Sequence, residues 1–227
     1  MSRRIELIVV DDHPIFRQGL VNVIETNERY KVIGEANTIA EAMSLVEAHP
    51  PNILLVDISL HHENGLELVK TIHRTMPQVY QLVISMYDEI IYASKALHAG
   101  SRGYVMKQEA TETLMNAIDT VLQGKIYLSD AMQERLIDAY ASWDTKRPEV
   151  DLLAKLSVRE MQVFRMIGQG FGVSEIAENL NLSGKTINAY RDNIRHKLFV
   201  SDAGSLRKLA IKWIQSEFVK DPLDPSE

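Results

Sequence analysis

The chain has 227 residues, 45% of them hydrophobic and 25% charged, which is typical of a folded globular protein rather than a disordered or fibrous one. It contains no cysteine, which excludes disulfides, thiolate metal sites and a cysteine nucleophile, and is consistent with a reducing cytosol. The net charge of −6 is uneven, because residues 1–128 carry −5 and residues 156–220 carry +4. This asymmetry suggests an acidic regulatory domain followed by a domain that binds a polyanion.

The sequence predicts neither a secretion signal nor a membrane span. Six mostly apolar residues separate Arg4 from Asp11, which is too short for the core of a signal peptide. No apolar run approaches the ~20 residues that a membrane helix requires. We therefore expect a cytoplasmic protein that does not interact with membranes.

The first half of the chain alternates short apolar runs with helical patterns. Nearly continuous apolar runs are typical of strands that are covered on both faces. Between these runs, apolar residues recur every three or four positions, as on the buried face of a helix. The order predicts an α/β fold with a doubly wound, five-stranded parallel sheet and right-handed crossovers. The predicted strands are Ile5–Val10, Tyr30–Ala36, Ile53–Val56, Gln81–Ser85 and Gly103–Met106.

The second half of the chain is predicted to be helical. An amphipathic helix over Ser129–Ser142 is expected to lead out of the first domain, and Trp143–Val150 has the composition of a flexible linker. The spacing Ser157-x-x-Glu160 predicts a capping box at the start of a further helix. The predicted segments are a first domain at 1–128, a linker helix and linker at 129–154, a helical domain at 155–220 and a disordered tail at 221–227.

Polar side chains stand where four of the predicted strands end. Asp11 and Asp12 follow the first strand, Asp57 follows the third, Ser85 ends the fourth and Lys107 follows the fifth. In an open parallel sheet, ligands bind at the carboxyl ends of the strands, where the strand order reverses. Each residue alone is more often a turn or surface residue, but their coincidence at four strand ends favours a functional site.

This set of side chains is suited to phosphoryl transfer. Three neighbouring carboxylates repel one another unless a hard cation binds them, and Mg²⁺ prefers oxygen ligands of this kind. One carboxylate can attack phosphorus, while the cation and the ammonium of Lys107 neutralise the developing charge.

Four motifs at these strand ends read Val-Val-Asp11-Asp12-His-Pro, Leu-Val-Asp57-Ile-Ser-Leu, Val-Ile-Ser85-Met and Gly-Tyr104-Val-Met-Lys107. They resemble the flavodoxin-like receiver domain of bacterial two-component response regulators, over residues 5–123. The resemblance implies that a sensor histidine kinase is the partner.

The resemblance also assigns roles to individual residues. Asp57 would be the phosphoacceptor, and Lys107 would pair with the acyl phosphate. Ser85 would hydrogen-bond the phosphoryl group, and Tyr104 would be the aromatic rotamer switch. Mg²⁺ would be held by a group of oxygen ligands that comprises the carboxylates of Asp11, Asp12 and Asp57 and the backbone carbonyl of Ser59.

We expect the chain not to be an enzyme, but one alternative belongs to that class. A phosphohydrolase could use Asp57 as its nucleophile, yet such enzymes commonly carry a second carboxylate two residues later, where this chain has Ser59. A dinucleotide site is disfavoured because the turn after the first strand lacks glycines. A scaffold protein with an inactive receiver is disfavoured by the complete set of reacting groups.

The predicted helix Ser183–Leu198 has one apolar face and one polar face. Ile187, Ile194 and Leu198 share the apolar face, with Tyr190 at its border. A short helix and a tight turn precede it, which is helix-turn-helix geometry, and the second helix of such a pair can enter the major groove of DNA. The alternative is a small helical bundle with an ordinary solvated face.

The sequence from Leu156 to Leu198, with its motif Ser183-x-Lys-Thr186-Ile-x-x-Tyr190, resembles the LuxR-type module attached to receivers of the NarL/FixJ subfamily. The resemblance implies a transcription regulator that binds specific double-stranded DNA sequences and forms a homodimer when phosphorylated. Many members carry a basic residue where Asn188 or Asp192 stands, so the resemblance does not determine which bases are preferred here. The implied DNA contacts are Lys185, Thr186, Asn188, Ala189, Arg191, Asp192 and Arg195.

Overall fold

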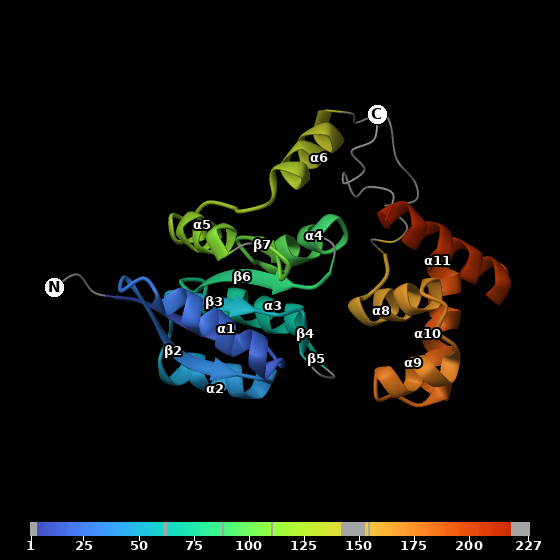
Figure 1. The fold of residues 1–227 in the computed structure, drawn as a ribbon, viewed down its shortest axis with the longest axis horizontal. Coiled ribbons are helices and arrows are strands. Elements are labelled where there is room, and N and C mark those ends of the chain that lie inside the picture. Colours follow the sequence, from blue (N-terminus) through green and yellow to red (C-terminus); the bar gives the residue numbers. More distant parts are fainter. Residues whose placement is uncertain are drawn as a thin grey trace, which may run out of the picture. The chain divides into compact units, whose positions relative to one another are not determined.

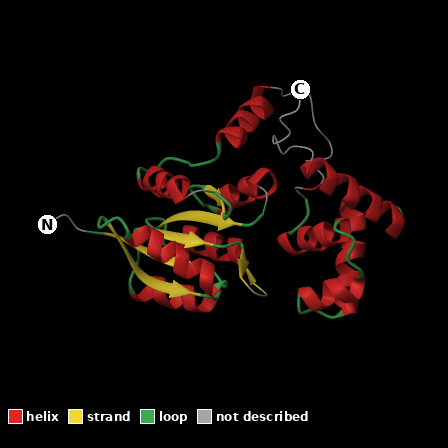
Figure 2. Ribbon diagram, in the orientation of Figure 1, coloured by secondary structure: helices red, strands yellow, loops and turns green. Residues whose placement is uncertain are grey.

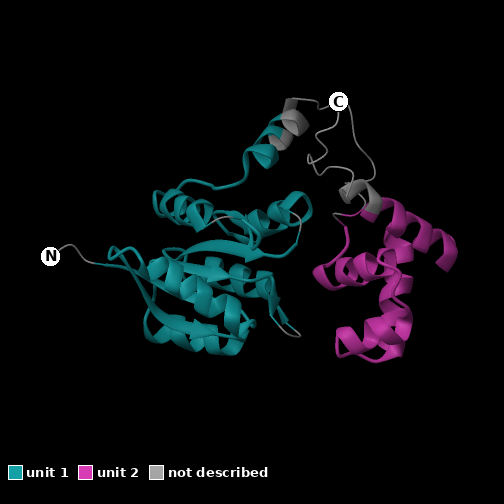
Figure 3. Cartoon of the chain, in the orientation of Figure 1, with its two compact units in different colours: residues 1–144 teal, residues 145–227 magenta. Residues whose placement is uncertain are grey.

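The structure is a computed structural model that describes residues 4–60, 63–87, 89–109, 111–141, 153 and 155–218. The chain divides into two compact units, residues 1–144 and 145–227 (Figure 3). The predicted flexible linker at 143–150 and the predicted tail at 221–227 lie outside the described residues. The proposed bounds of the four segments therefore remain predictions.

Unit 1 contains a five-stranded parallel sheet with the strand order β2-β1-β3-β6-β7 (Figures 1 and 2). The chain runs from β1 outward to β2 and then crosses to the other side of β1, so the order reverses between β1 and β3. This confirms the predicted doubly wound sheet. Its strands are β1 (Ile5–Val10), β2 (Tyr30–Ala36), β3 (Ile53–Val56), β6 (Tyr80–Ser85) and β7 (Tyr104–Met106).

Helices cover both faces of this sheet. On one face, α1 (Pro14–Glu25) contacts β1 and β2, and α5 (Thr111–Leu122) contacts β6 and β7. The other face carries α2 (Ile39–Ala48), α3 (Gly65–Thr75) and α4 (Glu89–Ala99), which contact one another in sequence. All four residues of β3 are at most 1% exposed, which explains why this strand is apolar throughout.

A two-stranded antiparallel ribbon follows β3 and was not predicted. It pairs β4 (Ser59–Leu60) with β5 (Glu63–Asn64), directly before α3. Strands of two residues are too short to show an alternating pattern, so they leave no periodic signal in the sequence.

A linker helix, α6 (Asp130–Ala141), follows α5 and is attached to α4 by a buried contact. Glu89, at the start of α4, is 6% exposed. Its carboxylate accepts a hydrogen bond from the backbone N–H of Ser129 at 2.9 Å and another from the Ser129 hydroxyl. The Ser129 hydroxyl oxygen also accepts from the N–H of Met132 in the first turn of α6. One carboxylate therefore joins the beginnings of two helices that lie far apart in the sequence.

Unit 2 is helical in its described part, as predicted. Ser157 and Glu160 form the predicted capping box, in which the Glu160 carboxylate accepts from the N–H of Ser157 at 2.7 Å. The helix α10 packs against α8 and α9, and α11 packs against α8, around the buried side chains of Phe164, Ile187 and Leu206. The helices are α8 (Val158–Gly168), α9 (Val173–Asn179), α10 (Gly184–Lys197) and α11 (Ala203–Phe218).

Candidate functional site

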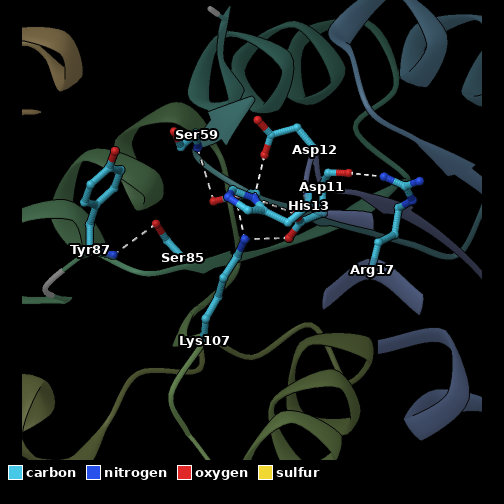
Figure 4. Close-up of polar contacts among 9 residues, drawn as sticks. Asp11, Asp12, His13, Arg17, Ser59, Ser85, Tyr87 and Lys107 are labelled. Carbon is cyan, nitrogen blue, oxygen red and sulfur yellow. Dashed lines mark hydrogen bonds and ion pairs between the residues drawn. The ribbon is translucent and has the colours of Figure 1, made fainter. Parts of the chain in front are cut away.

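The structure places the predicted polar residues of unit 1 together at the carboxyl ends of the strands (Figure 4). The sheet register produces this proximity, because Val10 pairs with Val56 and the N–H of Asp57 donates to the carbonyl of Val10 at 2.8 Å. Asp11 and Asp57 therefore follow adjacent strands at the same level. Both are buried, with exposed fractions of 1% and 3%.

Lys107 lies between these two carboxylates. Its Nζ is 2.6 Å from Oδ2 of Asp11 and 2.7 Å from Oδ2 of Asp57, and its side chain is 3% exposed. The backbone N–H of Lys107 donates to the carbonyl of Ser85 at 2.8 Å, which continues the pairing of β7 with β6. The ring of Phe16 covers the ammonium, with 4.5 Å between Nζ and the ring centroid. The lysine is thus fixed by the sheet, by two carboxylates and by an aromatic ring.

The electrostatics of Asp57 are dominated by its burial. Burial raises the pKa of the Asp57 carboxyl from 3.8 to about 6, although the ammonium of Lys107 acts in the opposite direction. Asp57 is therefore mostly ionised at neutral pH, but at a cost in free energy. Further positive charge beside it would lower that cost.

The carboxylates of the site fit a divalent cation. Ligand atoms of Asp11, Asp12, His13 and Asp57 all lie within 4.8 Å of one another. The single ammonium of Lys107 contacts Asp11 and Asp57, while Nδ1 of His13 lies 2.7 Å from Oδ1 of Asp12. Three carboxylates and this largely exposed histidine form an oxygen-rich cluster of the kind that binds hard cations.

Ser59 and Ser85 also lie at this edge, as predicted. The backbone N–H of Ser59 donates to Oδ1 of Asp57 at 3.2 Å. The hydroxyl oxygen of Ser85 accepts from the N–H of Tyr87 at 3.3 Å, and Ser85 is completely buried. The hydroxyl of Tyr104 donates to the carbonyl of Tyr87 at 2.8 Å, and its ring is buried. Ser85 and Tyr104, the two residues predicted to form a switch, therefore contact the N–H and the carbonyl of Tyr87, respectively.

Two residues of this region were missed by the sequence analysis. Tyr87 contacts Ser85 and Tyr104 through its backbone, which any residue type could do, so its identity carried no signal. Gly65 begins α3 directly behind Asp57, where an added Cβ would lie 1.9 Å from the Asp57 carbonyl oxygen. Only glycine fits there without a backbone shift, and an Asn-Gly pair after a strand was its one available signal.

The predicted DNA-contact residues lie on α10 in unit 2. Ile187, Ile194 and Leu198 are buried as predicted, while a polar face is left accessible. Lys185, Asn188, Ala189 and Asp192 are exposed, and Thr186, Arg191 and Arg195 are partly buried.

Arg195 is held in place by contacts within unit 2. Its Nη1 donates to Oδ1 of Asp192 at 3.1 Å, and its Nη2 donates to the carbonyl of Ser201 at 2.7 Å. Two of its five N–H donors are therefore already engaged within the protein. The ion pair also offsets the negative charge of Asp192 on this face.

Comparison with known families and proteins identifies the family of each unit. A family model described as the response regulator receiver domain matches residues 7–119, and a second, described as bacterial regulatory proteins of the luxR family, matches residues 154–210. The response regulator UvrY of Escherichia coli O6:H1 is 34% identical over 209 residues, which cover 92% of this chain and 94% of UvrY. The oxygen regulatory protein NreC of Staphylococcus epidermidis is 30% identical, covering 94% of this chain and all of NreC.

Solved structures resemble the chain over most of its length. A complex of the two-component response regulator RcsB with DNA is 28% identical, covers 91% of this chain and 98% of its own, and has a TM-score of 0.55. RcsB of Salmonella enterica serovar Typhimurium, bound to the promoter rprA with the phosphomimetic BeF3⁻, is 27% identical, covers 92% and 99%, and has a TM-score of 0.59. Within the described residues, every helix is too short or too polar to cross a membrane.

Proposed function

From the premise that this chain belongs to the two-component response regulators of the NarL/FixJ type, with a receiver domain and a LuxR-type DNA-binding domain, we propose that phosphorylation of Asp57 controls its binding to DNA. The observation that carries this proposal is the buried Asp57 carboxylate, which lies 2.7 Å from the Lys107 ammonium and next to Asp11 at the carboxyl edge of the sheet. The phosphoryl donor would be a sensor histidine kinase.

In the proposed reaction, an oxygen of Asp57 attacks the phosphorus of a phosphohistidine, and the histidine nitrogen leaves with the electron pair of the broken P–N bond. The product is an acyl phosphate on Asp57. Lys107 neutralises charge on the phosphoryl oxygens, and its fixed position avoids reorganisation during transfer. The N–H of Ser59 already donates to Asp57 and holds one oxygen of that carboxylate in place.

Mg²⁺ is the cation that this site would hold, through the clustered carboxylates of Asp11, Asp12 and Asp57. The family implies the backbone carbonyl of Ser59 as a further ligand. When bound, it would supply positive charge to the phosphoryl group in transfer. Burial raises the pKa of Asp57, and a bound cation would act in the opposite direction, as the Lys107 ammonium already does.

The phosphorylated state would be sensed through Ser85 and Tyr104. A phosphoryl group that accepts a hydrogen bond from Ser85 draws this hydroxyl away from the N–H of Tyr87. Tyr104 donates to the carbonyl of the same residue, so a shift of Tyr87 changes the position that the Tyr104 ring favours. The surface formed by α4 and α5 then changes, which we propose as the cause of homodimer formation. A ligand shifts such an equilibrium only by its differential affinity for the two states.

A dimer would present two copies of α10 to DNA half-sites about 34 Å apart. In this dimer, Lys185 and Arg191 would contact phosphates, and the exposed Asn188 would hydrogen-bond a base edge. RcsB, whose structures include DNA complexes, supports this use of the module. The roles proposed for Lys185 and Asn188 rest on their exposure, whereas Arg191 is partly buried.

Labelling of the full chain by a small phosphodonor with Mg²⁺ tests the phosphoacceptor. Intact-mass analysis is expected to show one phosphoryl group on the wild type and none on Asp57→Asn, while the control Asp119→Asn, at a partly exposed carboxylate on α5, is labelled normally. Labelling of Asp57→Asn at the wild-type rate would refute the assignment. Continuous release of inorganic phosphate from the donor, without stable labelling, would instead favour the phosphohydrolase.

Sedimentation velocity and DNA binding test the output. Phosphodonor with Mg²⁺ is expected to raise the dimer fraction and to tighten binding to a two-fold-symmetric DNA site. Tyr104→Ala should weaken both effects while Asp57 is still labelled, because Tyr104 lies outside the reacting groups. If oligomeric state and DNA affinity are both unchanged by phosphorylation of the wild type, the proposed activation is wrong.

A further inference from the structure

Arg17, at the end of the first turn of α1, reaches back to the loop that carries the acidic pair. Its Nη1 donates to the backbone carbonyl of Asp11 at 2.5 Å, and its Nε donates to Oε2 of Glu35, next to the end of β2, at 3.1 Å. The Arg17 side chain is 17% exposed, so these contacts are partly shielded from water. In Figure 4, Arg17 approaches Asp11 from the side away from Lys107.

These contacts fix the peptide group between Asp11 and Asp12. The carbonyl of this peptide group, that of Asp11, is held by Arg17, while the N–H of Asp11, in the preceding peptide group, donates to the carbonyl of Ala36 at 3.0 Å. Because a peptide group is planar, holding its carbonyl sets the direction in which Asp12 leaves the strand. The loop beyond it is held in turn by Oδ1 of Asp11, which accepts from the N–H of His13 at 2.8 Å.

We propose that Arg17 is a positioning residue for the cation site, which orients the carboxylates of Asp11 and Asp12 through the backbone between them. This inference rests on the proposed function, because it requires that the site binds a divalent cation. Partners that orient metal ligands from outside typically contribute about 10- to 100-fold to metal affinity. Since Arg17 acts through one carbonyl, we expect an effect of about 10-fold, at the lower end of that range.

A purely electrostatic role for Arg17 predicts a different result. A guanidinium near a cation site repels the cation, so its removal would tighten binding, and lysine would act like arginine because it carries the same charge. The positioning role predicts weaker binding in both variants. Lysine lacks the planar fork of donors that contacts the Asp11 carbonyl and Glu35 together.

The test is Mn²⁺ binding to the full chain, measured from the electron paramagnetic resonance signal of the free ion. Arg17→Ala and Arg17→Lys are each expected to raise the dissociation constant about 10-fold. The matched control is Arg102→Ala. Arg102 also donates to a backbone carbonyl, that of Gly124 at 3.0 Å, but it lies before β7 at the opposite end of the strands.

The positioning role of Arg17 would be overturned if Arg17→Lys bound Mn²⁺ as tightly as the wild type, or if Arg17→Ala bound it more tightly. If the alanine variant does not fold, the lysine variant alone tests the role. The labelling rate of Arg17→Lys by a phosphodonor should recover at saturating Mg²⁺, because Asp57 is untouched. If the wild type does not bind Mn²⁺, both the proposed cation site and the role of Arg17 are wrong. If the wild type and the Arg17 variants bind Mn²⁺ with the same affinity, only the role of Arg17 is wrong.

Discussion

Replacement of Asp57 by asparagine is expected to stabilise unit 1 at neutral pH in the absence of divalent cations. The pKa of Asp57 is about 6 in the folded chain and 3.8 for the ordinary side chain, so the folded state holds this proton more tightly. The free energy of unfolding therefore falls as pH rises from about 4 to about 6, and remains lower above that range. A rise of about two pH units corresponds to about 3 kcal/mol.

Asparagine avoids this cost but also loses the contact with Lys107. Because Lys107 keeps Asp11 at 2.6 Å, the ammonium is not left without a carboxylate. We therefore expect a net stabilisation of about 1–3 kcal/mol at pH 7.5, which shrinks toward zero near pH 4, where Asp57 of the folded wild type is protonated. Mg²⁺ should narrow the difference at neutral pH, because it binds the folded wild type.

Urea unfolding of the full chain with a chelator, at several values of pH, measures this effect. Hydrogen exchange of the amides of β3 assigns the change to unit 1. The control is Glu47→Gln, at an exposed carboxylate on α2, which should change stability by less than about 0.5 kcal/mol. An Asp57→Asn variant that is no more stable than the wild type at pH 7.5, or whose advantage persists at pH 4, would refute the reasoning.

Three other substitutions give independent tests. Gly65→Ala should slow phosphodonor labelling at least about 10-fold, because its Cβ would lie 1.9 Å from the Asp57 carbonyl oxygen, and a normal rate would contradict this. Lys197→Met should lower the stability of unit 2 by about 1–3 kcal/mol in thermal unfolding, because Lys197 lies 2.6 Å from the buried Glu160 carboxylate. Unchanged stability would show that water can take the place of the ammonium beside Glu160. Phe199→Gly should instead stabilise unit 2 by about 0.5–1 kcal/mol, because Phe199 has a φ of 55°, which strains a residue with a side chain, and its ring is 80% exposed. A lower melting temperature would show that the contacts of the ring outweigh the relief of this strain.

The sheet and most of the site could be predicted because both depend on strong local signals. Burial on both faces makes each strand apolar, so a polar residue at its end stands out in the sequence. Parallel topology then brings such ends together, which is why Asp11, Asp57 and Lys107 were assigned to one site before their contacts were known. In unit 2, the positions of Ile187 and Ile194 identified the buried face of α10 in the same way.

The contacts that could not be predicted run through the backbone or between distant surface residues. Arg17 donates to a carbonyl, and Tyr87 offers its own backbone groups, so neither partner leaves a pattern in the sequence. Arg195 is predicted from the sequence to contact DNA, and its contact with the Ser201 carbonyl depends on how the chain turns after α10. Such contacts need the tertiary structure, because they depend on distance and direction rather than on residue type.

The contact of Glu89 with Ser129 has a consequence for where the receiver can be divided. A fragment that ended at Leu128 would keep every strand of the sheet but would remove the two donors that the buried Glu89 carboxylate accepts from. Its α4 would start from an unsatisfied buried charge, and its surface would differ from that of the intact protein. A rotation of α4 in the full chain would displace Ser129 and, through it, the first turn of α6. The smallest fragment suitable for studying signalling by the receiver therefore extends beyond the sheet and includes α6.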